Sequence, residues 1–148
     1  MMKYFTIKEL TASATAKRKG IDNKPTQDIT NALVALVENV LDPLREAYGK
    51  PIIVTSGYRS VKLNKAVGGA ANSQHTKGEA ADIRSVSDDP KENKVIFDLI
   101  RQMNLPYDQL INEYNYDWVH VSFSRYKKRK QVLAATKKNG KTIYTIVK

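Results

Sequence analysis

A long apolar stripe in the first third of the chain constrains the fold more than any other feature of the sequence. After Thr26, large apolar residues recur at steps of three and four positions, which places them on one face of a helix. Such a face is stable only when other elements cover it. Gly49-Lys50-Pro51 marks the expected end of this helix, because glycine and proline are typical of positions just beyond a helix. The stripe comprises Ile29, Leu33, Leu36, Val37, Val40, Leu41 and Leu44.

The remaining periodicity places helices early and strands late. A capping-box pattern predicts a short helix over residues 6–12, whereas the polar stretch 13–25 is expected to be mostly loop. One or two helical turns are expected over 60–67, and a second long helix from Asp88-Asp89-Pro90 onward, with acidic residues at its N-terminus. Alternating and β-branched segments predict strands over 52–55, 79–83, 109–113, 118–123, 131–136 and 142–147, with a hairpin turn at Asn139-Gly140.

The order and number of these elements indicate the fold class. The chain has 148 residues, the length of one domain, and shows neither an internal repeat nor a low-complexity linker. Helices followed by a run of strands are typical of α+β proteins. We therefore expect one α+β domain over residues 1–148, with helices packed on a mainly antiparallel sheet.

Composition excludes several classes of protein. The chain has no cysteine, which excludes a disulfide scaffold, a zinc finger and a thiol nucleophile. No segment reaches the roughly 18–20 apolar residues of a membrane span. The N-terminal residues 1–6 lead into no apolar run, so we expect no Sec signal peptide. A protein of this kind would be made in the cytoplasm and would need another route of release to act outside it.

The charge of the chain is strongly positive. There are 25 Lys and Arg against 15 Asp and Glu, a net charge of +10, with dense basic runs at 17–19 and 125–130. Such a surface favours polyanions, among them nucleic acid, anionic lipid and the acidic polymers of a bacterial envelope. No nucleic-acid-binding module is recognisable, so nucleic acid is not expected as the partner.

The two histidines of the chain are the candidate metal ligands. His75 precedes Asp82 by seven residues, and His120 lies in an expected strand whose alternation separates it from an apolar face. From the residues alone, a polar loop with a strand-end aspartate and a structural histidine explains the pattern as well as a ligand set does. Two imidazoles and a carboxylate are nevertheless enough to hold zinc with one position open, as in catalytic sites.

Three segments resemble a known family. Ser-x-His-x-x-Gly-x-Ala-x-Asp over 73–82, Trp-x-His over 118–120 and Ser-Gly-Tyr-Arg-Ser over 56–60 resemble the zinc D-Ala-D-Ala carboxypeptidase and L-Ala-D-Glu endopeptidase family of peptidoglycan hydrolases, peptidase M15. The resemblance covers about residues 4–125 and is closest to compact members often found in phages and prophages. It implies a hedgehog/DD-peptidase-like fold and leaves a basic, β-rich part over 126–148.

The resemblance also implies roles for individual residues. One Zn²⁺ per chain would be bound by His75, Asp82 and His120. Asp117, three residues before His120, matches the general base, although many members have glutamate there, and Glu113 is the fallback. The remaining matches concern the substrate: Arg59 would hold a carboxylate or polarise the scissile carbonyl, and Ser73 would contact the substrate.

The expected function is therefore hydrolysis of an amide bond in the stem peptides of bacterial peptidoglycan by a monomeric zinc peptidase, including the role of a phage endolysin. D-Ala-D-Ala trimming and L-Ala-D-Glu cleavage both fit the residues. Two alternatives stay open. One is a zinc-containing domain that binds cell wall without catalysis, and the other is a basic nucleic-acid-binding protein, which explains the charge and leaves the His, Asp and His pattern unexplained.

Overall fold

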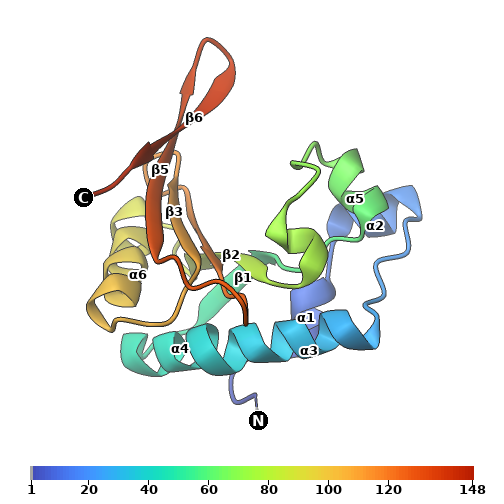
Figure 1. The fold of residues 1–148 in the computed structure, drawn as a ribbon, viewed down its shortest axis with the longest axis horizontal. Helices are drawn as coiled ribbons and strands as arrows, with labels where there is room; N and C mark the ends of the chain where they lie inside the picture. The colour runs from blue at the N-terminus through green and yellow to red at the C-terminus, as the bar shows by residue number, and fades with distance from the viewer. Residues whose placement is uncertain (1) are drawn as a thin grey trace.

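A six-stranded sheet forms the centre of the computed structural model, which describes residues 2–148; Met1, where the expected domain begins, lies outside the described residues (Figure 1). The strand order is β1-β2-β4-β3-β5-β6, and every neighbouring pair is antiparallel except β3 and β5. The predicted α+β class with a mainly antiparallel sheet is confirmed. The strands are β1 (Ile52–Ser56), β2 (Ala80–Ser85), β3 (Gln109–Glu113), β4 (Trp118–Ser122), β5 (Gln131–Lys138) and β6 (Lys141–Ile146).

The predicted long helix is present as three consecutive segments. Five residues of π-helix, η1 (Val37–Leu41), join α3 (Gln27–Leu36) to α4 (Asp42–Tyr48), and the helical run ends at Gly49 in the left-handed conformation. The other helices are α1 (Ile7–Thr11), α2 (Ala14–Lys19), α5 (Val61–Ala66), the 3₁₀ helix η2 (Gln74–Lys77) and α6 (Pro90–Gln102).

The prediction of a loop over 13–25 was wrong for its first half, where α2 forms. The side chain of Ser13 accepts a hydrogen bond from the backbone N–H of Ala16, and Gly20 ends the helix at a left-handed φ of 63°. These two caps satisfy backbone groups at both ends of a helix of only six residues, which has little apolar surface to reveal it in the sequence.

The main hydrophobic core lies between the long helices and one face of the sheet (Figure 1). Alternation along β2 and β4 directs Ala81, Ile83, Val119 and Val121 into this core, and all four are fully buried. The opposite face of the same strands is therefore left for polar side chains. The helices contribute Leu33, Leu36, Val37, Val40, Leu41, Leu44, Ile96, Phe97 and Ile100.

The basic C-terminal part extends the sheet beyond β3. Strand β5 pairs with β3 in parallel, and β6 returns along β5 as an antiparallel hairpin that projects from the body of the protein (Figure 1). The predicted turn is confirmed, because Asn139 and Gly140 both have positive φ angles, 53° and 78°. Within residues 2–148, no helix is long and apolar enough to cross a membrane.

Candidate metal centre

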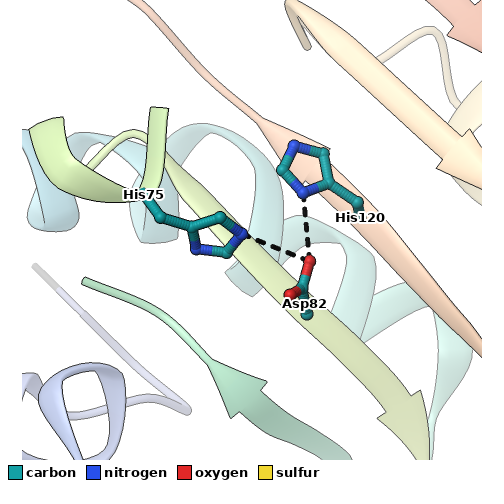
Figure 2. A group of neighbouring side chains, drawn as sticks. All are labelled: His75, Asp82 and His120. Carbon is teal, nitrogen blue, oxygen red and sulfur yellow. Dashed lines mark hydrogen bonds and ion pairs between the residues drawn. The ribbon is translucent and has the colours of Figure 1, made fainter. Parts of the chain in front are cut away.

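His75, Asp82 and His120 converge on the polar face of the sheet (Figure 2). Asp82 and His120 are direct cross-strand partners on β2 and β4, so their side chains point to the same face. His75 reaches them from η2, with its Nε2 3.3 Å from Asp82 Oδ1, while His120 Nδ1 lies 3.0 Å from the same oxygen. The predicted convergence of these three residues is present in the structure.

Local structure around η2 fixes the position of His75. The side chain of Ser73 accepts a hydrogen bond from the backbone N–H of His75 at 3.2 Å. Gly78 ends η2 at a left-handed φ of 71°, a conformation that glycine adopts without strain, which is why the chain can turn back into β2.

A backbone carbonyl sets the protonation of the His75 ring. His75 Nδ1 lies 2.7 Å from the carbonyl oxygen of Gly57, and because a carbonyl can only accept, Nδ1 must carry the proton. Position 57 requires glycine, because a Cβ there would stand 2.1 Å from the carbonyl oxygen of Leu10. The other ring nitrogen, Nε2, therefore faces the carboxylate and is the atom left to bind a metal, an orientation that the outer hydrogen bonds of metal-binding histidines commonly produce.

The donor set fits a zinc ion. His75 Nε2 lies 3.3 Å from a carboxylate oxygen of Asp82, a separation that allows a cation to bind to both atoms. Ligands bound to one tetrahedral zinc at about 2.0–2.2 Å lie about 3.3–3.6 Å apart. The three candidate ligand atoms all lie within 4.8 Å of one another. Two imidazoles and one carboxylate leave a fourth position open, as in catalytic zinc sites.

Electrostatics at the cluster favour an ionised Asp82. Its burial alone would raise the pKa of the carboxyl, but His75 and His120 act more strongly together and lower the pKa below its usual range. A carboxylate that stays ionised is the form that binds metal.

A cavity of about 660 Å³ opens over the cluster and contains the predicted substrate residues. Arg59 and Ser73 line one side of it, and the backbone N–H of Arg59 donates to the carbonyl of His75 at 3.0 Å. Burial lowers the pKa of Arg59, against the influence of Asp82. Within residues 2–148, the buried Nε of Arg59 and Nε1 of Trp118 have no hydrogen-bond partner.

The two candidate bases occupy different surroundings. Glu113 is buried, lines the cavity, and is the cross-strand partner of Trp118, two residues from His120 on the same face of β4. Burial raises the pKa of Glu113 to about 7; His120 acts against this rise and Asp82 adds to it. Asp117 is exposed in the turn between β3 and β4 and is not among the residues that line the cavity. The structure therefore brings Glu113 to the cluster and leaves Asp117 outside.

The C-terminal part forms one side of the cavity, and no sequence motif indicated this. Arg129, Leu133, Thr142 and Tyr144 line it together with Ile111 of β3. They come to the site through the parallel pairing of β5 with β3, which joins segments that no local pattern connects. The sequence signals near them were the basic run at 125–130, the predicted strands over 131–136 and 142–147 and the hairpin turn, and none of these indicated a place in the site.

Comparison with known proteins gives two matches. The family model described as Peptidase M15 matches residues 3–122. A segment of 54 residues is 52% identical to the zinc D-Ala-D-Ala carboxypeptidase of Streptomyces albus G. That segment is 36% of this chain and 20% of the relative, so the match spans about a fifth of the relative's length. The family match ends at β4 and does not include β5 or β6.

Proposed function

Since this chain belongs to the peptidase M15 family, we propose that it is a zinc-dependent peptidase that hydrolyses an amide bond in the peptide stems of bacterial peptidoglycan. The observation that carries the proposal is the placement of a His, Asp and His cluster and a buried glutamate in one open cavity. The similarity to a zinc D-Ala-D-Ala carboxypeptidase favours removal of a terminal D-alanine as the reaction.

His75, Asp82 and His120 are the proposed ligands of one zinc ion per chain. When bound, zinc would supply a Lewis acid and a water of lowered pKa. The protein holds its ligands ready for this ion, because the sheet register fixes Asp82 beside His120 and the Gly57 carbonyl fixes the ring of His75. The three side chains are largely buried, so little rearrangement is needed for binding.

Glu113 is the proposed general base. It would accept a proton from the attacking water and pass it to the leaving amine, a role for which a carboxyl with a pKa near neutrality is suited. The sequence resemblance favoured Asp117 for this role. We assign it to Glu113 instead because Glu113 shares the face of the sheet and the cavity with His120, whereas Asp117 is exposed in the turn.

Arg59 and Ser73 are the proposed substrate contacts. The guanidinium of Arg59 is a permanently charged planar donor, suited to the terminal carboxylate of a stem peptide or to the oxygen of the scissile carbonyl. The position of Arg59 in the lining of the cavity supports this role, and its buried Nε is not already engaged by a protein acceptor within residues 2–148. Trp118 offers a second such donor through its indole N–H.

The test combines metal content with product analysis. Purified protein should take up one equivalent of zinc and release D-alanine from a pentapeptide stem, as measured by metal analysis and mass spectrometry. Release of a fragment cut between L-alanine and D-glutamate would assign the endopeptidase activity instead. Zinc binding and retention on sacculi without any turnover would indicate a wall-binding domain, and protein that takes up no zinc would contradict the proposal. His120→Ala is the matched control and should lose both metal and activity.

A further inference from the structure

The C-terminal hairpin supplies a side of the cavity that the family match does not include. We propose that Tyr144 on β6 is a specificity-determining residue that binds the stem peptide about two residues before the bond that is cut. The inference rests on the proposed function and extends it to a subsite of the same cavity. It concerns residues that lie beyond the matched range 3–122.

Sheet register places Tyr144 on the same face as the metal ligands. Glu113 pairs with Trp118 on one side and with Ala135 on the other, and Ala135 pairs with Tyr144. Direct partners in a sheet point to the same face, so these four side chains form one row across β4, β3, β5 and β6. Ala135, a small residue in the middle of the row, leaves the tyrosine ring room to lie across it toward Glu113.

The spacing of strands gives the distance of this subsite from the reaction. Tyr144 lies three strands from β4, about 14 Å at about 4.8 Å per strand. Directed along this row toward Glu113, a tyrosine side chain spans roughly half of that distance, so its hydroxyl can meet a ligand about 7–8 Å from β4, the strand of the proposed ligand His120. An extended peptide advances about 3.3 Å per residue, so the contact falls about two residues away. In a carboxypeptidase substrate, only the residues before the cut bond extend that far, because a single residue follows it.

The floor of this subsite is apolar and its upper edge is polar. Ile111 and Leu133 belong to a small hydrophobic cluster separate from the main core, and both line the cavity. A stem peptide offers alanine methyl groups for such a floor and main-chain carbonyls for a donor above it. The Tyr144 side chain is 53% exposed, and within residues 2–148 its hydroxyl has no hydrogen-bond partner. Burial of the phenol raises its pKa, with Glu113 adding to the effect, so it stays a donor.

Two contacts hold the hairpin in place against the site. At its base, Arg129 donates to the fully buried Asp108 through Nε at 2.7 Å and through Nη2 at 3.0 Å. Near Tyr144, the hydroxyls of Thr142 and Tyr114 are hydrogen-bonded at 2.6 Å, which joins β6 to the end of β3. A hairpin fixed at two points is preorganised for binding, so a ligand does not have to order it.

Substrate length distinguishes binding at this subsite from a general effect on the fold. We would compare the zinc-loaded wild type with Tyr144→Phe and Tyr144→Ala on a pentapeptide stem and on a capped D-Ala-D-Ala dipeptide, which is too short to reach β6. On the pentapeptide, Tyr144→Phe should raise KM about fivefold, the effect of one hydrogen bond, and Tyr144→Ala about tenfold or more. On the dipeptide, KM and kcat should match those of the wild type.

Controls separate this inference from the proposed function. Ile143→Ala changes the same strand on the opposite face, and Tyr126→Phe makes the same chemical change at an exposed residue outside the cavity; neither should alter KM. Calorimetric binding of the pentapeptide to zinc-loaded Glu113→Gln, with and without Tyr144→Phe, should show the same fivefold difference in affinity without turnover.

Equal increases in KM on both substrates, or no increase on either, would overturn the role of Tyr144 while leaving the proposed peptidase activity intact. A wild type that cleaves neither substrate would overturn the proposed function, and the subsite with it.

Discussion

Glu113 and Asp117 stand at the two ends of one hairpin connection and have opposite surroundings. Glu113 ends β3, with only 8% of its surface exposed, and lines the same cavity as the proposed metal ligands. Asp117, directly before β4, is exposed. Because both acids are near His120 in the sequence, the comparison shows that proximity to a ligand does not decide which acid reaches the site.

The turn between the two acids explains the difference. Tyr114, Asn115 and Tyr116 all have positive φ angles, 53°, 60° and 67°, which are uncommon for residues other than glycine. The side chain of Asn112 accepts a hydrogen bond from the N–H of Tyr116 at 2.6 Å. The buried Asn93 of α6 donates to the carbonyl of Tyr116 at 3.0 Å and to that of Asp117 at 3.3 Å. These contacts fix the turn, and its last residue, Asp117, is exposed and does not line the cavity.

The largest effect, on the rate of hydrolysis, is expected for Glu113→Gln. The amide keeps the shape of the side chain but cannot accept a proton, so kcat should fall on the order of 10²- to 10⁴-fold. Zinc content should be unchanged, because Glu113 is not one of the proposed ligands. Release of D-alanine and metal analysis of the same sample measure the two quantities. A variant that hydrolyses at the wild-type rate would exclude Glu113 as the base and return the role to Asp117.

The second prediction concerns the titration of Glu113. Burial favours the neutral acid, so in zinc-free protein the carboxyl should take up its proton as the pH falls through about 7, well above the usual value of 4.5. A bound zinc ion should lower this pKa, because a nearby positive charge favours the carboxylate. Carbon-13 NMR of labelled glutamate and aspartate measures both values. If the signal with the raised pKa persists in Glu113→Gln and vanishes in Asp117→Asn, the raised pKa belongs to Asp117 and not to Glu113.

A smaller effect, on stability, is expected when Asn93 no longer holds the turn by hydrogen bonds. Asn93→Ala removes both donors to the turn and the acceptor for the N–H of Ser85, which lies 2.8 Å away. Leaving buried backbone groups unpaired should lower the free energy of unfolding by roughly 1–3 kcal/mol. Asn39→Ala is the control, since the exposed Asn39 donates only within its own helix, to Ala35. Denaturant unfolding measures the difference, and equal losses in both variants would remove the special role of Asn93.

The smallest effects, on both stability and activity, are expected for substitution of Asp117. Asp117→Asn and Asp117→Glu change an exposed side chain outside the cavity, so the free energy of unfolding should change by less than about 0.5 kcal/mol. Activity of both variants should stay within about twofold of the wild type. A loss of turnover in Asp117→Asn that Asp117→Glu restores would show that this acid does enter the site during the reaction.

The sequence predicted the parts of the site that depend on local patterns. Strand alternation over 118–123 correctly separated His120 from the apolar face, and Gly49-Lys50-Pro51 correctly marked the end of the long helix. The order of helices and strands was sufficient for the fold class. Residues close in sequence and fixed by one element are predictable in this way, because their relative positions follow from the period of the element.

Longer-range features were not predictable from the same patterns. The turn that places Glu113 inside the site depends on Asn93, which is 20 residues away on another element. The contribution of Tyr144 to the cavity depends on the parallel pairing of β5 with β3, and the hairpin signal at Asn139-Gly140 gives no indication of which strand β5 joins. In both cases the deciding contact is between residues far apart in the chain.

The direct pairing of Asp82 with His120 has a consequence for how this site can tolerate insertions and deletions. Gain or loss of one residue within β4 would shift the strand by one position, so that His120 would point into the core and a valine would face Asp82. A two-residue change keeps the faces correct and moves His120 along the strand instead. Length variation compatible with function is therefore expected at the exposed tip of the β5–β6 hairpin around Asn139, and excluded from the short segment between Glu113 and His120.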